Sequence, residues 1–134
     1  LSIDKTAPGQ ALEVGKKLAT LVPITKTLIV VDKDVDVLNR TEVMQAVGAR
    51  WQPYPAAEII KEARGMPLDP SAPKRPMSSK IVIDATRQWP EEGGPAVYPE
   101  RNRDLLNKLA PEAKKLVDAR WEEYMRGWKR DRGW

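Results

Sequence analysis

Three aspartates follow the most apolar stretch of the sequence and are its clearest candidates for chemistry. Asp32, Asp34 and Asp36 come directly after the run Leu28–Val31. Carboxylates at this spacing could bind a divalent cation or supply a nucleophile and a proton-transferring acid. A calcium-binding EF-hand is excluded, because its sixth and twelfth loop positions require glycine and glutamate and this sequence has valine at both. Two interpretations stay open: a reactive acidic site, or a solvated structural loop between a strand and a helix.

Histidine and cysteine, which carry much of enzyme catalysis, are both absent from the sequence. Their absence excludes serine–histidine and cysteine–histidine nucleophile systems, imidazole metal ligands, thiolate sites and disulfide bonds within these residues. Any chemistry performed by this chain alone must use carboxylates, lysine, arginine, tyrosine or hydroxyl groups.

Length and composition indicate one globular domain spanning residues 1–134. A chain of 134 residues buries roughly two thirds of its unfolded surface when it folds. No apolar run approaches the ~20 residues of a membrane span, and no signal peptide is visible. We therefore expect a cytoplasmic protein without a membrane association.

The charge pattern is basic at the end of the chain. The net charge is +4, and the last nine residues hold four cations against one acid. A basic tail beside Trp128 and Trp134 could contact nucleic acid. A solvated end, or an arm that docks on a partner subunit, is the favoured interpretation.

Hydrophobic periodicity predicts the elements that position the acids. Apolar residues at helical spacing predict helices over 10–22 and 42–50, the second with Thr41 as its N-cap. Continuous apolar runs predict buried strands over 27–32 and 80–84. This alternation predicts an α/β fold with a small, largely parallel sheet flanked by helices. The acids would then lie at the carboxyl edge of the sheet, where open α/β folds bind ligands.

The remaining segments are less regular. Residues 56–64 fit either a strand or a helix, and residues 66–79 are a loop because four prolines deny them regular hydrogen bonding. From residue 100 the chain reads as helical and ends in a long helix and basic tail over 111–134. Trp121, Tyr124 and Trp128 share one face of that helix, so we expect this face to dock on a partner.

The strand with its acids also resembles the nucleophile motif of haloacid-dehalogenase-type phosphatases. In that family the first acid, here Asp32, attacks phosphorus, and the second, here Asp34, handles the proton beside Mg²⁺. The family also needs a later acidic pair after another strand, where this sequence has the single acid Asp84. A small Mg²⁺-dependent phosphatase-like enzyme is therefore kept as an alternative.

Four stretches in order resemble the C-terminal domain of the UbiD-type, prenylated-flavin-dependent decarboxylases. SIDKTAPGQALEVG (2–15) is similar to the strand, Pro-Gly turn and helix that open this domain. VVDKDVDVLNRTEVMQAVGAR (30–50) resembles its VDxDVD strand and following helix. RGMPLDPSA (64–72) and KIVIDATRQW (80–89) resemble its PLDPS loop and its K-x-x-x-DAT-x-x-W segment.

The resemblance also implies what this chain lacks. In the family, an N-terminal domain and a split β-barrel hold the prenylated FMN, a catalytic Arg-Glu-Asp/Glu set and a divalent metal site. We therefore expect no catalytic or metal-binding residue here, and a cofactor bound mainly by a missing region or a partner chain. A natural short subunit, a processed fragment and an excised domain all remain open.

The resemblance assigns two site residues. In aromatic-acid decarboxylases of the family, the apolar residues of the x-P-L loop line the substrate pocket; they correspond to Met66 and Leu68. Anchoring of the loop on the domain's own core is the alternative role for this pair. Some members also place a lysine near the flavin, for which Lys16, Lys17 and Lys26 are candidates.

The sequence thus predicts the C-terminal domain or subunit of a UbiD-like (de)carboxylase acting on an aromatic or unsaturated carboxylic acid. Its role would be to complete the pocket and a homo- or hetero-oligomer, while a larger UbiD-like chain carries catalysis. The alternatives are the phosphatase-like enzyme and a non-catalytic binding module.

Overall fold

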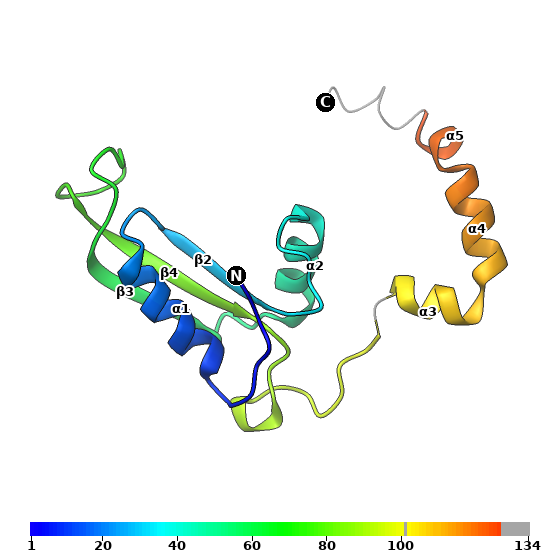
Figure 1. Cartoon of the computed structure of the whole chain (residues 1–134), viewed down its shortest axis with the longest axis horizontal. Coiled ribbons are helices and arrows are strands. Elements are labelled where there is room, and N and C mark those ends of the chain that lie inside the picture. Colours follow the sequence, from blue (N-terminus) through cyan, green and yellow to red (C-terminus); the bar gives the residue numbers. More distant parts are fainter. Residues whose placement is uncertain (101, 127–134) are drawn as a thin grey trace. The chain divides into compact units, whose positions relative to one another are not determined.

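The computed structural model describes residues 1–100 and 102–126. The chain divides into two compact units, Leu1–Ala96 and Val97–Trp134, and each is described by itself. The first is an α/β layer, and the described part of the second is helical (Figure 1).

A four-stranded sheet with strand order β1-β2-β4-β3 forms the centre of the first unit. The parallel strands are β1 (Ser2–Ile3), β2 (Thr27–Asp32) and β4 (Met77–Ala85). The remaining strand, β3 (Ala57–Arg64), pairs antiparallel with β4 at one edge. The predicted α/β class with a small, largely parallel sheet is confirmed.

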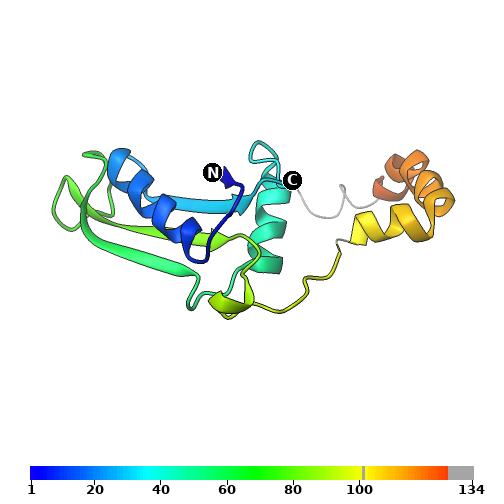
Figure 2. The same cartoon turned by 60° about the horizontal axis from the view of Figure 1, so that its bottom comes forward.

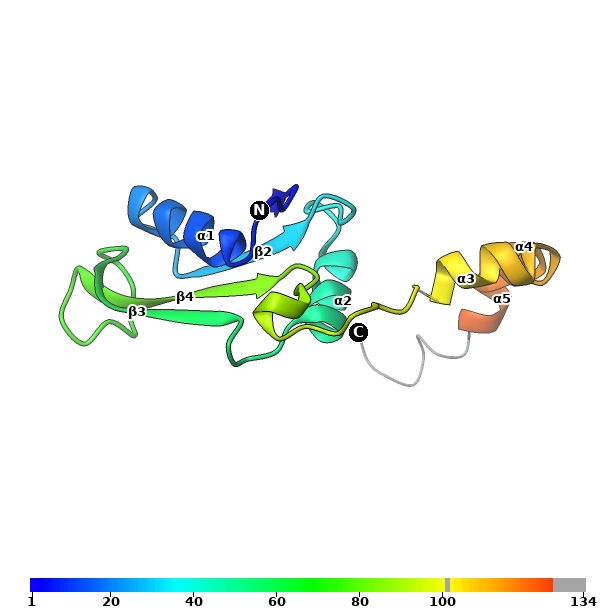
Figure 3. The same ribbon diagram turned by 90° about the horizontal axis from the view of Figure 1, so that it is seen from below.

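Two helices cover opposite faces of this sheet. Adjacent residues of a strand point to opposite faces, and Val30 and Val31 of β2 are both buried, at 0% and 1% exposure. The helix α1 (Gln10–Leu21) packs on the Val30 face, and α2 (Arg40–Arg50) packs on the Val31 face. Figures 2 and 3 show α1 running along the strands and α2 standing at the end where β2 and β4 finish. The prediction that β2 is buried on both faces is therefore correct at these two positions.

The segment that fitted either a strand or a helix is the strand β3. A bulge between Ile60 and Ala63 includes Glu62, whose φ of 51° lies in the left-handed region. Beyond the bulge, Arg64 pairs with Met77, so β4 begins three residues before the predicted start at Lys80. Pairing with β3 extends β4 into the stretch that the prolines had marked as loop.

The described part of the second unit contains three short helices: α3 (Asn102–Leu109), α4 (Pro111–Ala119) and α5 (Trp121–Met125). The predicted long helix over 111–134 is interrupted at Arg120, which has φ −105° and ψ 8°. Its amide donates to the carbonyls of both Leu116 and Val117 at 3.2 Å, which tightens the last turn of α4. No glycine or proline marks this break, and the predicted helix and tail beyond residue 126 lie outside the described residues. None of the helices in the described part of the chain is long and apolar enough to cross a membrane.

The contact between α1 and the sheet depends on a glycine. A Cβ atom at Gly15 would overlap Val82 Cγ1 and lie 3.3 Å from Val30 Cγ2. Gly15 is itself buried, so α1 approaches the sheet more closely than any larger residue allows.

We predict opposite effects of alanine at the two helical glycines. Gly15→Ala should lower the free energy of unfolding by about 1–3 kcal/mol, because it overpacks the contact with Val82. Gly48→Ala on α2 is the matched control, since nothing lies within 4 Å of the place that its new Cβ atom would take. It should raise that free energy by up to about 1 kcal/mol through helix propensity alone. Urea denaturation of both variants checks this, and a stabilised Gly15→Ala protein would contradict the tight contact.

Candidate functional site

A buried arginine binds the aspartates at the carboxyl edge of the sheet. Arg50, the last residue of α2, has a side chain only 7% exposed. Its Nη1 donates to Asp32 Oδ2 at 2.7 Å and to Asp34 Oδ1 at 3.0 Å, and its Nη2 donates to Asp34 Oδ2 at 3.0 Å. One guanidinium therefore joins the end of β2 and the loop after it to the end of α2.

A second arginine reaches the same carboxylates from the loop after β4. The amide of Arg87 donates to Asp32 Oδ2 at 2.8 Å, and its Nη2 donates to Asp34 Oδ2 at 2.7 Å. Burial alone would raise the pKa of Asp34, but hydrogen bonds from Arg50 and Arg87 outweigh it and lower that pKa to about 2. Both arginines thus hold Asp34 as a carboxylate at neutral pH.

These contacts leave the acidic edge unsuited to phosphatase chemistry. Both oxygens of Asp34, and the Oδ2 of Asp32, already accept hydrogen bonds from arginine groups. Asp84 does not supply a second acidic pair: it is 1% exposed and its Oδ1 accepts from the amide and hydroxyl of Thr86 at 2.9 and 2.6 Å. Within residues 1–100 and 102–126, no group of three or more acidic, histidine or cysteine side chains is placed to hold a metal ion. The geometry therefore argues against the phosphatase-like alternative.

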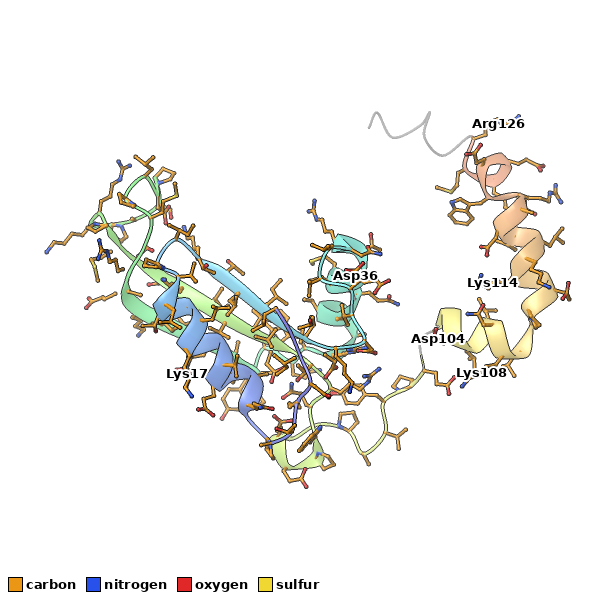
Figure 4. All side chains as sticks on the ribbon, viewed as in Figure 1. Lys17, Asp36, Asp104, Lys108, Lys114 and Arg126 are labelled. Atoms are coloured by element: carbon orange, nitrogen blue, oxygen red, sulfur yellow. The ribbon has the colours of Figure 1, made fainter. Side chains whose placement is uncertain are left out.

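Asp36 has a separate, local role beside α2 (Figure 4). Its Oδ1 accepts from the amide of Leu38 at 2.9 Å, which closes the loop before the helix. The N-cap of α2 is Asn39, whose Oδ1 accepts from the amides of Thr41 and Glu42 at 3.1 and 3.4 Å. The prediction of Thr41 as the cap was wrong, because α2 begins at Arg40, two residues before the predicted start, and Asn39 caps it.

A buried ion pair that the sequence did not reveal lies at the same edge of the sheet. Lys5 Nζ is 2.6 Å from Glu92 Oε2, and the two side chains are 2% and 8% exposed. Lys5 also donates to the Thr86 hydroxyl at 3.0 Å and to the Arg87 carbonyl at 2.6 Å. The loop after β1 is thereby tied to the loop after β4.

Glu92 is satisfied by three donors. Besides Lys5, the amides of Gly9 and Trp89 donate to its carboxylate at 2.6 and 2.7 Å. Burial would raise the pKa of Glu92, but these hydrogen bonds, that of Lys5 foremost, lower it. In the sequence, Lys5 lies in the first of the four family-like stretches (2–15) and Trp89 lies in the last (80–89). Glu92 lies outside all four stretches, so they did not indicate its pairing with Lys5.

The lysine of the K-x-x-x-DAT segment is also structural. Lys80 is 4% exposed and donates to the carbonyls of Ala19 and Val22 at 2.6 and 3.3 Å. It thereby satisfies carbonyls at the C-terminal end of α1. Burial lowers the pKa of this ammonium group.

The two predicted substrate-binding residues lie at the opposite end of the sheet from the acids. Met66 and Leu68 belong to the loop between β3 and β4, beside the start of β2. The six residues of β2 span about 20 Å, so the structure does not bring these residues together with Asp32. Met66 is 45% exposed and Leu68 is 73% exposed. Neither is anchored in this unit's core, so the alternative role as core anchors is not supported.

The three candidate lysines have different surroundings. Lys17 lies on α1 and is paired with Glu13 at 2.6 Å (Figure 4). Lys16 lies 3.9 Å from Glu58. Of the three, Lys26 reaches the Met66–Leu68 loop, through Asp69 at 2.9 Å.

The predicted interface residues are exposed where the structure describes them. Trp121 and Tyr124 are 54% and 47% exposed, and the Arg120 guanidinium lies 5.2 Å from the Tyr124 ring centroid. Trp128 and the basic tail fall outside the described residues. The aromatic face is therefore available on α5 as far as this helix is described.

The Arg50 network predicts unequal effects of removing its two arginines. Arg50→Met should lower the free energy of unfolding by about 3–5 kcal/mol, because it leaves two partly buried carboxylates without their main partner. Arg87→Met is the control and should cost about 0–1 kcal/mol, since the Arg87 side chain is 44% exposed. Urea denaturation at neutral pH measures both losses. Equal losses of unfolding free energy in the two variants would contradict the conclusion that Arg50 is the main partner of Asp32 and Asp34.

Comparison with known proteins places the chain in a family. The family model for the 3-octaprenyl-4-hydroxybenzoate carboxy-lyase C-terminal domain matches residues 1–85. A phenolic acid decarboxylase of Sedimentibacter hydroxybenzoicus is 43% identical over 74 residues, which cover 55% of this chain and 15% of that protein.

Solved structures give the same result. The closed form of vanillic acid decarboxylase from Sedimentibacter hydroxybenzoicus matches with a TM-score of 0.67 and 34% identity, covering 87% of this chain and 25% of that one. The UbiD-class enzyme HmfF from Pelotomaculum thermopropionicum, solved in complex with FMN, matches with a TM-score of 0.66 and 33% identity, covering 75% of this chain and 22% of that one. The chain spans about a quarter or less of the length of these three relatives. By its sequence and its fold, this chain belongs to the UbiD carboxy-lyase family, within that family's C-terminal domain.

Proposed function

We propose that this chain is the C-terminal domain or subunit of a prenylated-FMN-dependent (de)carboxylase that acts on an aromatic or unsaturated carboxylic acid. It completes the substrate pocket and the oligomer, and the remaining UbiD regions, in a longer polypeptide or a larger partner chain, carry catalysis. The observation that carries this proposal is the match of residues 1–85 to the UbiD C-terminal domain, combined with an exposed Met66–Leu68 loop.

The chemistry of the described residues supports the division of labour. Asp32 and Asp34 are bound by Arg50 and Arg87, and Lys5 and Lys80 are buried against protein partners. The described residues offer no metal-binding cluster, so they do not fit the divalent metal. A relative solved with FMN covers far more sequence than this chain. We therefore assign the flavin and the metal to the regions outside these 134 residues.

The helical unit supports a docking role. None of residues 104–126, for which burial is described in α3, α4 and α5, is buried. Seven large side chains of these helices are between 41% and 75% exposed: Leu105, Leu106, Leu109, Leu116, Val117, Trp121 and Tyr124. Amphipathic helices of this length gain their stability mainly from packing. We propose that this face, continuing to Trp128, docks on a neighbouring chain or domain.

We predict that Met66 sets the size of acid that the complete enzyme prefers. Met66→Ala should enlarge the pocket and shift kcat/KM toward bulkier acids, with discrimination changing by about 1–3 kcal/mol per methylene-sized difference. Leu38→Ala is the matched control, because Leu38 is also exposed (93%) but follows the opposite end of β2. Relative kcat/KM over a graded series of acids measures the shift. Unchanged preferences with a lowered melting temperature would end the pocket assignment.

We predict that the aromatic face holds the assembly together. Trp121→Ala should weaken association by about 2 kcal/mol or more, as removal of a buried tryptophan does at an interface hot spot. Glu122→Ala, its exposed neighbour on α5, should leave the assembly intact. Analytical ultracentrifugation of the two variant assemblies distinguishes them, and an unaltered mass for Trp121→Ala would show that this face has another partner within its own chain.

A further inference from the structure

The loop that carries Met66 and Leu68 is held at its base by the β3–β4 hairpin. The amide of Gly65 donates to the carbonyl of Pro76 at 2.7 Å, and the amide of Met77 donates to the carbonyl of Lys74 at 2.7 Å. These bonds fix where the chain leaves β3 and where it enters β4. They leave the intervening segment, residues 66–73, to be positioned by other contacts.

Asp69 organises that segment from within. Its amide donates to the carbonyl of Met66 at 3.1 Å, which closes a turn containing both Met66 and Leu68. Its Oδ1 accepts from the amide and the hydroxyl of Ser71 at 3.0 and 2.8 Å. The Asp69 side chain is only 11% exposed although it belongs to a surface loop. The position of Asp69 therefore determines the position of the turn.

Lys26 fixes Asp69 relative to the sheet. Its Nζ donates to Asp69 Oδ2 and Oδ1 at 2.9 and 3.2 Å, and also to the Ser71 hydroxyl. Its own carbonyl accepts from the amide of Ile81 at 3.0 Å, so its backbone is held against β4 just before β2 begins. Lys26 therefore ties the loop to the sheet from outside the loop, and we call its contact with Asp69 and Ser71 the latch.

The carboxylate of this contact is ionised under ordinary conditions. Hydrogen bonds from Lys26 and from Ser71 lower the pKa of Asp69 to about 2. The carboxylate is therefore charged throughout the neutral range, and the contact with Lys26 does not switch with physiological pH.

We propose that Lys26 is a positioning residue for substrate selection: by binding Asp69 and Ser71 it sets where the Met66–Leu68 turn stands. The step from a fixed turn to substrate choice rests on the proposed function, in which this turn lines the pocket. Lys26 touches no substrate in this account. It acts through the loop. Without Lys26, the side chains of Met66 and Leu68 are no longer held in one position, and the enzyme discriminates less between acids.

The test compares four variants in the complete, cofactor-loaded assembly: Lys26→Met, Lys26→Arg, Asp69→Asn and Lys17→Met. Lys26→Met removes the cation and Asp69→Asn removes the charge that it binds. Lys17→Met is the control, because Lys17 is a lysine of α1 whose ion pair is with Glu13 one turn away. Two readouts are taken for each: hydrogen exchange of the amides that the non-proline residues of 66–73 carry, and kcat/KM over the graded acid series.

Lys26→Met and Asp69→Asn should each speed exchange in residues 66–73 several-fold, the size expected for an ion pair whose lysine is half exposed, and should reduce discrimination among the acids several-fold. Lys26→Arg keeps a cation, so its amide exchange and its discrimination among the acids should both lie closer to those of the unmodified protein than the values for Lys26→Met do. Lys17→Met should change neither. Unchanged exchange in both Lys26→Met and Asp69→Asn would overturn the latch, even if Met66→Ala still alters the preference.

A different result would overturn the link to selection. Faster exchange with an unaltered ranking of acids means that the latch exists but does not govern substrate choice. In that case Met66→Ala decides whether the proposed pocket is also wrong. This substitution shifts the ranking of acids by kcat/KM if the turn lines the pocket, and it leaves the ranking unchanged if the turn does not. Failure of the latch and failure of the proposed function are thereby distinguished.

Discussion

The first unit depends on one buried cation, the guanidinium of Arg50. At the carboxyl edge of a parallel sheet, Asp32 and Asp34 would repel each other as neighbouring carboxylates. Arg50 binds both at 2.7–3.0 Å with a side chain 7% exposed. Because it is the last residue of α2, it also fixes that helix against the end of the sheet. Two of the three acids that first suggest catalysis, Asp32 and Asp34, therefore hold a helix, a strand and a loop together through Arg50.

The two ends of the sheet differ in how their polar side chains are used. The carboxyl edge is closed by ion pairs, those of Arg50 and the Lys5–Glu92 pair. The opposite end carries an exposed loop, which the Lys26–Asp69 contact holds. A rigid scaffold with one presented loop suits a domain that completes a pocket built elsewhere. It does not suit a domain that performs chemistry at its own sheet edge.

Local patterns predicted the elements that local physics determines. The apolar run 28–31 predicted β2, and the spacing of Leu12 and Leu18 with their neighbours predicted α1, because each pattern is set within a few residues. β3 stayed ambiguous, since its charged residues around the bulge at Glu62 hide the alternation of a strand. The break between α4 and α5 at Arg120 was not predicted, because no glycine or proline occurs there.

The candidate site was predicted less completely, for a physical reason. Arg50 lies 16 and 18 positions from the aspartates that it binds, and Lys5 lies 87 positions from Glu92. Such partners meet only after the sheet and α2 have assembled, so periodicity and short motifs cannot pair them. The four family-like stretches include Arg50, both aspartates and Lys5, but they did not indicate which of these side chains contact one another.

In the proposed function, these 134 residues shape the pocket and the remaining UbiD regions carry catalysis. The most direct test of this division of labour is CO₂ release from aromatic and unsaturated acids with prenylated FMN, comparing this chain alone with the chain joined to the remaining UbiD regions. The account predicts turnover only in the joined enzyme, and steady turnover by the chain alone would contradict it.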